Sequence, residues 1–233
     1  MRTMEYFETA RWVAPAVLGV ALLLGFVPQA NLATTSHAAN PTRNVAELTA
    51  MWWQWALGIP ASQNPLLDET GEFAGVGQPY KGSKVFFLAG LLGSGAAERS
   101  ITVPEGTTFF FPLVTAFFID SIGRGRDPVN NPTVPQLYDI VEAQVDTVHD
   151  LSVTLDEVSL LDRAQRVQSP PFALKLPENN IFDAAAGEYA PGVSDGYWLS
   201  IPALPPGTYE LKFGGTIEAF NASIDITYHI TIE

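Results

Sequence analysis

Hydrophobic and polar residues alternate along much of the C-terminal half of the chain, and this alternation predicts antiparallel sheet. It is clearest over residues 224–232, where every second residue is Ile or Tyr and those between are polar. Successive side chains of a strand point to opposite faces, so such a segment has one buried face and one wet face. Shorter runs of the same kind predict strands at 151–155, 166–167, 172–176, 197–201 and 208–213.

The N-terminal half also contains segments that predict strands. Residues 85–89 are a short, continuous apolar run followed by glycine, which is typical of a strand buried on both faces. Residues 101–103 are expected to form another short strand. Residues 107–119 are dense in aromatic and β-branched side chains, with Pro112 among them. Because proline cannot donate to a sheet ladder, we expect two strand pieces there around a bulge or bend.

Residues 44–57 predict an amphipathic helix that Gly58 and Pro60 terminate. Its apolar stripe consists of Val45, Leu48, Trp52 and Trp55. Trp53 lies off this stripe; we expect the cluster of Trp52, Trp53 and Trp55 to join the core, with a contact surface as the alternative for Trp53. The segment that follows, 60–84, holds Pro, Gly, Asn and Asp without periodicity and is interpreted as a layer of loops.

A second helix is predicted at about 134–149. Thr133 can cap its start and Pro135 suits its first turn. Its apolar face comprises Leu137, Ile140, Val141, Val145 and Val148. His149 would then end the helix, where a cation offsets the negative end of the helix dipole.

These elements define the fold class. Eight to ten short strands with two helices, and no strand–helix–strand alternation, predict a mostly β protein: a two-sheet antiparallel sandwich or a jelly roll. No internal repeat or linker is visible, so we expect a single domain over residues 39–233.

The first 38 residues are predicted to be a signal peptide. Arg2 and Arg11 precede an apolar run over 12–27, and a small-residue exit ends at Ala38. A spanning helix needs about 20 apolar residues, and this run is shorter. We therefore favour cleavage over an uncleaved anchor and expect a secreted or periplasmic protein; contact with a membrane would arise only through an uncleaved segment.

Charge and composition exclude several classes of protein. The formal net charge is −13, and the predicted signal peptide contains equal numbers of acidic and basic residues, so the mature domain has the same charge. Such a domain repels nucleic acid and anionic lipid. No cysteine is present, which excludes thiolate nucleophiles and Cys-ligated metals. Only His149 and His229 remain after residue 38, and His229 is expected on a solvated strand face. We predict no catalytic residue, metal or cofactor.

The polar loop at 120–133 is the first candidate site. Its candidate ligand-binding residues are Asp120, Arg124, Arg126, Asp127 and Asn130. Arginine forks suit a small oxyanion or a sugar, whereas Asp and Asn oxygens suit calcium. The spacing does not match a calcium hand and the arginines oppose a cation. The alternative is a surface loop tied down by Arg–Asp pairs.

Asp195 and Trp198 form the second candidate site. Tyr197, Leu199 and Ile201 alternate inward, which leaves Trp198 facing outward. An exposed Trp beside a carboxylate can stack on a sugar ring. The alternative is that a neighbouring loop or helix covers this tryptophan, because large aromatic side chains are seldom left bare.

Several phrases of the sequence are similar to those of an uncharacterised family of exported bacterial proteins. They include WQWALGIP at 53–60, VFFLAG at 85–90, RVQSP at 166–170, DGY at 195–197 and LPPG at 204–207. The resemblance implies export and a β-rich sandwich domain, and it brings no named activity. It also implies cysteines in relatives near Phe73 and Ser100, which this chain lacks.

Three functions are compatible with these features. The favoured hypothesis is a non-enzymatic exported domain that binds a ligand or partner, either a carbohydrate or a protein. A carboxylate-based polysaccharide hydrolase is the second, because acidic residues are plentiful, although an abundance of acids does not itself identify a catalytic pair. The third is a structural component of a cell surface or extracellular matrix, which long exposed sheet edges would favour.

Overall fold

The predicted mostly β architecture is present. The computed structural model describes residues 44–79, 84–119 and 131–233. In chain order the helices and strands are α1 (Val45–Leu57), β1 (Val85–Phe87), β2 (Gly95–Val103), β3 (Thr108–Ile119), α2 (Val134–Val145), β4 (Val148–Leu155), β5 (Val158–Ser159), β6 (Gln165–Arg166), β7 (Phe172–Leu176), β8 (Gly187–Ile201), β9 (Gly207–Ile217) and β10 (Ala222–Ile232). Short 3-10 turns are η1 (Ala61–Gln63), η2 (Leu161–Arg163) and η3 (Glu218–Phe220).

Two five-stranded sheets form the sandwich. Sheet A has the order β1-β3-β8-β6, with β7 also paired to β8, and sheet B has the order β2-β10-β9-β4-β5. Most neighbours are antiparallel, as predicted, but β1 pairs with β3 and β2 pairs with β10 in parallel. Periodicity shows which side chains of a strand are buried and carries no information about the direction of its neighbour, so the sequence pattern could not distinguish these two pairs.

The inner faces of the two sheets enclose the main core. Phe111 of β3 meets Phe213 of β9 with ring centroids 4.6 Å apart, and Phe213 stacks on Tyr228 at 6.1 Å. Tyr228 and its apolar neighbours on β10 are buried in this cluster, which confirms the period-two pattern of 224–232. The register of β3 shifts between Pro112 and Val114, so the predicted interruption is a bulge within one strand rather than a gap between two.

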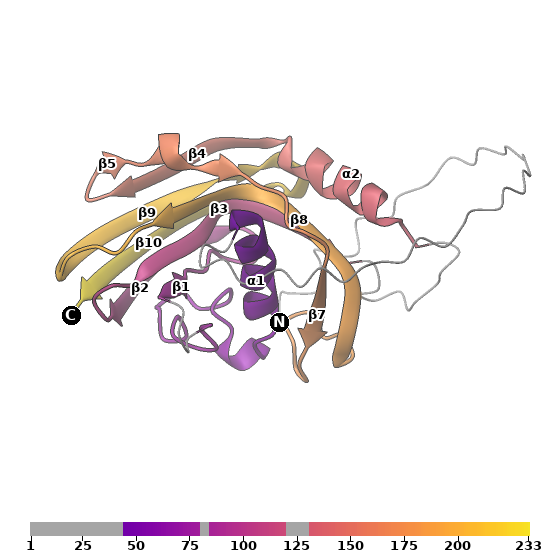
Figure 1. Cartoon of the computed structure of the whole chain (residues 1–233), viewed down its shortest axis with the longest axis horizontal. Helices are drawn as coiled ribbons and strands as arrows, with labels where there is room; N and C mark the ends of the chain where they lie inside the picture. The colour runs from indigo at the N-terminus through magenta and orange to yellow at the C-terminus, as the bar shows by residue number, and fades with distance from the viewer. Residues whose placement is uncertain (1–43, 80–83, 120–130) are drawn as a thin grey trace, which may run out of the picture. The chain divides into compact units, whose positions relative to one another are not determined.

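Helix α1 covers the other face of sheet A, so this sheet is buried on both sides (Figure 1). Trp52 packs edge-on against Trp198 of β8 at 5.5 Å and donates from Nε1 to the Leu88 carbonyl at 2.9 Å. Trp53 is 4% exposed and packs on Phe117, with centroids 4.2 Å apart. The three tryptophans therefore lie in the core, as predicted, and the alternative of a contact surface is wrong for Trp53 because sheet A buries more of the helix than its single apolar stripe.

Helix α2 packs on β8 and β3 beside sheet B (Figure 1). Thr133 and Gln136 form a capping box at its start, as the capping pattern predicted. The helix ends at Val145, four residues before the predicted end, and Val148 already begins β4. Val148 fits the helical period and the strand period equally well, which explains the error. His149 consequently lies in a strand and pairs with Asp150 at 2.9 Å instead of closing a helix.

A buried guanidinium fixes the loop layer, residues 60–79 and 88–92, to sheet B. Arg99 is 1% exposed and lies on the apolar face of β2, between Ala97 and Ile101. Its Nη1 donates to the Tyr228 hydroxyl at 2.7 Å, and its other contacts are with main-chain carbonyls. These carbonyls belong to Pro65, Asp68, Ala89 and Gly90. All five N–H donors of the side chain therefore have an acceptor.

Asp68 organises the turn that lies over β2. Its Oδ1 accepts from the amide of Thr70 at 2.8 Å and of Gly71 at 3.0 Å, and its Oδ2 accepts from the amide of Phe73 at 2.9 Å. Burial opposes ionisation of this carboxyl, but these hydrogen bonds outweigh it, so the pKa of Asp68 lies below its usual 3.8. The turn places the Thr70 carbonyl 3.2 Å from the Ser100 amide, where it covers part of the outer edge of β2.

We predict that Arg99→Lys lowers the free energy of unfolding by about 3–5 kcal/mol. The ammonium group of lysine has three donors on one nitrogen and lacks the planar arrangement of the guanidinium, so buried carbonyls would be left without a donor. Urea denaturation of residues 39–233 measures the change. Tyr228→Phe is the control and should cost about 1–2 kcal/mol, since it removes one hydroxyl from the same cluster. An Arg99→Lys protein as stable as the parent would show that the guanidinium does not hold the loop layer.

The depressed pKa of Asp68 predicts a specific pH dependence. A carboxyl with a lower pKa in the folded state stabilises the fold above pH 3.8, and this contribution is lost as the pH falls from 3.8 through the folded value. Asp68→Asn should therefore cost about 1–3 kcal/mol at pH 7 and progressively less below pH 3.8. Glu72→Gln, an exposed change in the same turn, serves as control. A difference between parent and Asp68→Asn that stays constant from pH 7 to pH 2.5 would contradict the assignment.

Candidate functional site

Helix α2 and sheet B cover the same face of β8, α2 near Val193 and sheet B near Tyr197. We call the boundary between these two covered parts of β8 the seam. On that face Val193 packs against Leu137 and Val141 of α2, whereas Tyr197 packs against the core between the sheets. Asp195 lies between these two residues on the same face, because alternate residues of a strand share a face. A carboxylate thus lies under the point where α2 ends and β4 begins.

Asp195 is buried and paired. Its exposed fraction is 0%, and its Oδ2 accepts from Nε of Arg166 at 3.1 Å and from Nη2 at 2.8 Å. Its Oδ1 accepts from the amide of Gly196 at 2.7 Å. An ionised carboxylate removed from water is tolerated only with such partners. The two hydrogen bonds from the Arg166 guanidinium therefore neutralise the buried charge of Asp195.

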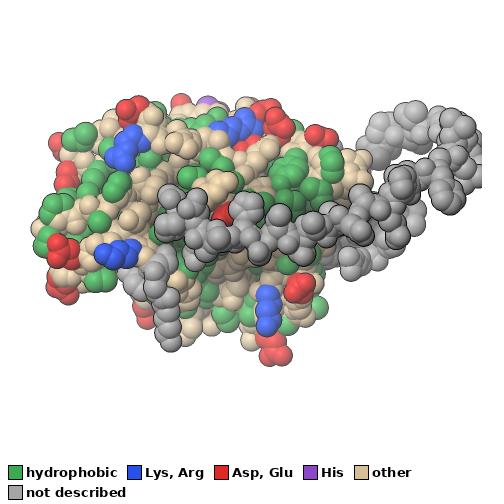
Figure 2. Space-filling view, viewed as in Figure 1, with side chains coloured by type: hydrophobic (Ala, Val, Ile, Leu, Met, Phe, Trp, Pro, Cys, Tyr) green, Lys and Arg blue, Asp and Glu red, His purple; other side chains and the backbone are tan. Residues whose placement is uncertain are grey.

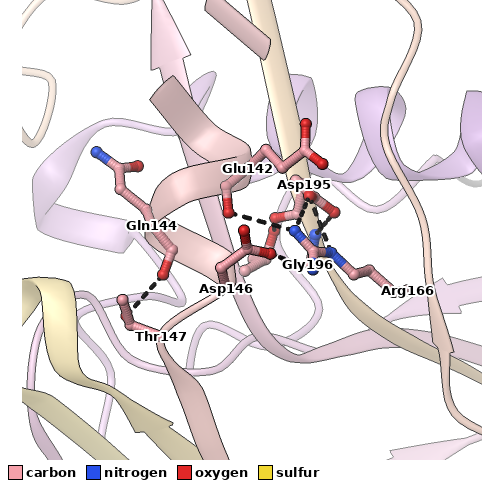
Figure 3. A network of polar contacts seen from close by, with 8 residues as sticks. Glu142, Gln144, Asp146, Thr147, Arg166, Asp195 and Gly196 are labelled. Atoms are coloured by element: carbon pink, nitrogen blue, oxygen red, sulfur yellow. Dashed lines mark hydrogen bonds and ion pairs between the residues drawn. The ribbon is translucent and has the colours of Figure 1, made fainter. Parts of the chain in front are cut away.

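Arg166 also links Asp195 to the end of α2 (Figure 3). Its Nη1 donates to Oδ1 of Asp146 at 2.6 Å, and Nη2 lies 3.3 Å from the carbonyl of Glu142. A cation at a helix C-terminus is favourable because it meets the negative end of the dipole. The hydrogen bonds that Arg166 donates to Asp195, opposed by burial and assisted by the hydrogen bond to Asp146, raise the pKa of Arg166 far above its ordinary range. The side chain is 31% exposed, so one edge of this network reaches solvent.

A pocket of about 430 Å³ adjoins the network, and we call it the seam pocket. It is lined by His149, Asp150, Leu151, Leu161, Ala164 and Tyr197. These residues come from the start of β4 in sheet B, from β8 in sheet A, and from η2 and Ala164, which lie in the connection between the two sheets. The walls are mainly apolar, and the polar groups lie at the rim.

A bulge in β4 shapes the rim. The register between β4 and β9 shifts between His149 and Ser152, and Asp150 has a left-handed backbone with φ 54°. Nδ1 of His149 lies 2.9 Å from Oδ2 of Asp150, and the two side chains are 51% and 82% exposed. The inserted residues thus hold an imidazole and a carboxylate at the mouth of the pocket, both open to water.

One exposed apolar side chain, Leu161, lies in the lining of this pocket. Among the described residues, four large hydrophobic side chains are exposed: Leu67, Val158, Leu161 and Phe220. Val158 on β5 is 64% exposed and Leu161 on η2 is 40% exposed. Leu161 belongs to the pocket lining, so the apolar wall of the pocket includes a side chain that is exposed at the surface.

A second hollow, of about 230 Å³, lies on the wet face of sheet B and includes Glu210 and His229. Here Nζ of Lys212 pairs with Glu210 at 2.6 Å, and Nε2 of His229 lies 2.7 Å from Glu98. This arrangement confirms that His229 is a solvated strand residue. The charged groups of this hollow already have partners, and it is the weaker candidate.

The predicted site residues have different outcomes. Asp120, Arg124, Arg126, Asp127 and Asn130 all lie outside the described residues. Asp195 lies in the seam network, but it is sequestered from any ligand. Trp198 is 1% exposed and stacks on Phe110 at 5.3 Å beneath α1. The exposed indole face that sugar stacking requires is absent, and the alternative of a covering helix is confirmed for Trp198.

Residues that the sequence reasoning missed make up most of the seam site. Arg166 and Asp146 were not recognised, and His149 was assigned to a helix end. One signal was available: the alternation that places Tyr197 and Leu199 inward also places Asp195 inward, and a buried carboxylate requires a cationic partner. The identity of that partner, 29 residues away, is not encoded locally.

The described part of the chain contains no group of three or more acidic or histidine side chains arranged to hold a metal ion. It also contains no helix long and apolar enough to cross a membrane. Asp68 and Asp195 are respectively 6% and 0% exposed, so neither of these two acids can reach a substrate in this arrangement.

Comparison with known proteins gives little further information. No family model matches the sequence, and no curated protein matches it. One solved structure, titled "Structure of PbICP-C in complex with falcipain-2", is 10% identical with a TM-score of 0.25; the match covers 65% of this chain and 100% of that chain. A TM-score this low does not indicate a common fold.

We predict that Arg166→Met lowers the free energy of unfolding by about 3–5 kcal/mol, because it leaves the Asp195 carboxylate buried without its cation. The double variant Arg166→Met with Asp195→Asn should regain part of this loss, since it removes the uncompensated charge. Urea denaturation of the four proteins in the cycle provides the test. Additive costs of the two substitutions would show that the pair is not coupled.

Proposed function

We propose that this chain is an exported, non-enzymatic β-sandwich protein that binds a protein partner at the seam pocket. The observation that supports this proposal is a mainly apolar pocket whose lining includes Leu161, a large hydrophobic side chain that is 40% exposed. Protein interfaces combine an apolar centre with a polar rim, and His149 with Asp150 supplies such a rim here.

The size of the seam pocket suits a side chain that anchors a partner. Small-molecule sites have volumes of about 300–1,000 Å³, and the seam pocket lies at the lower end of this range at about 430 Å³, which is large enough to admit one side chain. Binding energy at interfaces is concentrated where a large side chain enters an apolar pocket and nearby contacts exclude water. Leu161 lies both in the pocket wall and on the surface, where it can contact the anchor and its neighbours.

The distribution of aromatic side chains favours a protein partner over a carbohydrate. Sugar sites rely on exposed aromatic faces, and the four tryptophans of the described chain, Trp52, Trp53, Trp55 and Trp198, are each less than 10% exposed. Tyr197 is the one aromatic residue in the pocket wall, and it is half-buried. The proposed export is supported by the basic, apolar and small-residue order of the first 38 residues.

Peptide display against residues 39–233 tests the proposed site. We expect selected peptides to lose binding at least tenfold with Leu161→Glu, because the change places a charge in an apolar contact. Phe220→Glu is the matched control: Phe220 is 41% exposed and Leu161 is 40% exposed, but Phe220 lies in the turn between β9 and β10. Peptides that bind both variants equally would show that the seam pocket is not the site.

The same proteins should be applied to a glycan array. Glycan binding without peptide binding would assign the domain to the carbohydrate class and overturn the proposal of a protein partner. The circular dichroism spectrum of each variant must match that of the parent, so that a loss of binding reflects the surface and not the fold.

A further inference from the structure

We infer that the seam pocket selects a basic–apolar segment of its partner, one in which an aliphatic or aromatic side chain is adjacent to Lys or Arg. This inference rests on the proposed function and specifies the chemistry of the partner. It is carried by the coincidence of an apolar pocket with carboxylates at its rim and around it.

The surroundings of the pocket are acidic. Residues 142–166, which supply most of the pocket and its border, contain six acidic residues against two basic ones. The acidic residues are Glu142, Asp146, Asp150, Asp156, Glu157 and Asp162, and all six are exposed. Figure 2 shows acidic side chains along the margins of one face, with several Lys and Arg side chains among them. An approaching cationic segment is therefore attracted over the whole region.

The cations of this region do not cancel its charge. Arg166 is shared by Asp195 and Asp146, so its single charge already faces two carboxylates. The other cation, Arg163, is the last residue of η2, and its Nη2 donates to the carbonyl of Ser200 at 3.4 Å. Nδ1 of His149 lies 2.9 Å from Oδ2 of Asp150, whose side chain is 82% exposed and therefore open to a cationic group of a partner.

The positions of the rim groups suit a basic side chain next to an apolar one. Asp150 lies in the pocket lining and is 82% exposed, so its oxygens are accessible from the mouth. Asp146, 59% exposed, lies four residues earlier. Lysine and arginine place aliphatic stems on apolar surfaces such as Leu161 while their charged ends remain in water. A partner residue that enters the pocket and a basic neighbour at the rim would satisfy both parts of the site.

Charge also opposes the alternative occupants. A second copy of this chain would bring another formal charge of −13 to the same surface, and an acidic segment would meet six exposed carboxylates. Each exposed carboxylate is expected to change affinity by about two- to fivefold, and added salt should reduce the effect.

The test uses three synthetic peptides that differ in one feature: Ac-Gly-Lys-Leu-Lys-Gly-amide, and the same sequence with Gln or with Glu in place of both lysines. Each is titrated into isotopically labelled residues 39–233 and followed by amide chemical shifts. The basic peptide should shift the amides of His149, Leu151 and Ala164 and should bind at least fivefold more tightly than the acidic one. Raising sodium chloride to 0.5 M should narrow this difference.

Two variants locate the charge preference. Asp150→Asn should weaken the basic peptide about two- to fivefold and leave the Gln peptide unchanged. Asp225→Asn removes the same charge from the exposed face of β10 and should change neither.

If all three peptides shift the amides of His149, Leu151 and Ala164 with equal affinity, the inference is overturned and the proposed function remains. Shifts confined to other surfaces, or no shift with any peptide at millimolar concentration, would contradict both. Tighter binding of the acidic peptide at the seam would overturn the charge preference alone.

Discussion

Sheet A is covered on both faces, and this constraint determines where the molecule can place charge. One face lies against sheet B and α2, and the other lies against α1. A central strand such as β8 therefore has no face in water along most of its length, and a charged residue on it requires a partner supplied from elsewhere in the chain. Asp195 is such a residue, and the search for its partner leads to the seam.

Two guanidinium groups provide hydrogen-bond donors to buried acceptors in this layered structure, each to a different kind of acceptor. Arg99 has no carboxylate in contact among the described residues and donates instead to four carbonyls and a phenol, so it serves as a hydrogen-bonding hub for irregular chain. Arg166 neutralises one buried carboxylate and reaches a helix end. Both uses depend on the planar fork of five donors, which lysine lacks.

The parts of the fold that the sequence predicted are those with a local cause. The burial of Ile226 and Ile230 follows from alternation within β10, and the capping of α2 follows from Thr133 and Gln136. The parallel direction of β2 beside β10 depends on a pairing between residues more than 120 positions apart, which no local pattern encodes. β2 also begins six residues earlier than predicted, because Arg99 interrupts its apolar face.

The candidate site was predictable only in part, for the same reason. Alternation correctly separated Trp198 from Tyr197, but it could not show that the side opposite Tyr197 is covered by α1 and not by water. Asp195 was identified as notable and given a ligand-binding role, whereas its environment makes it a buried counter-ion. The seam pocket itself is formed by three segments that are distant in sequence, so it became visible only once they were assembled.

The bulge at the start of β4 has a consequence for self-association. Sheet B ends on that side with β5, which is two residues long, and β4 is paired to it only at Thr154 and Leu155. A regular strand left open there would offer a template on which further chains could polymerise. The irregular backbone at Asp150 and the acidic surroundings interrupt that template. The irregularity at the mouth of the pocket therefore also works against fibre formation, so a single distortion of one strand shapes the proposed binding site and discourages stacking of identical chains.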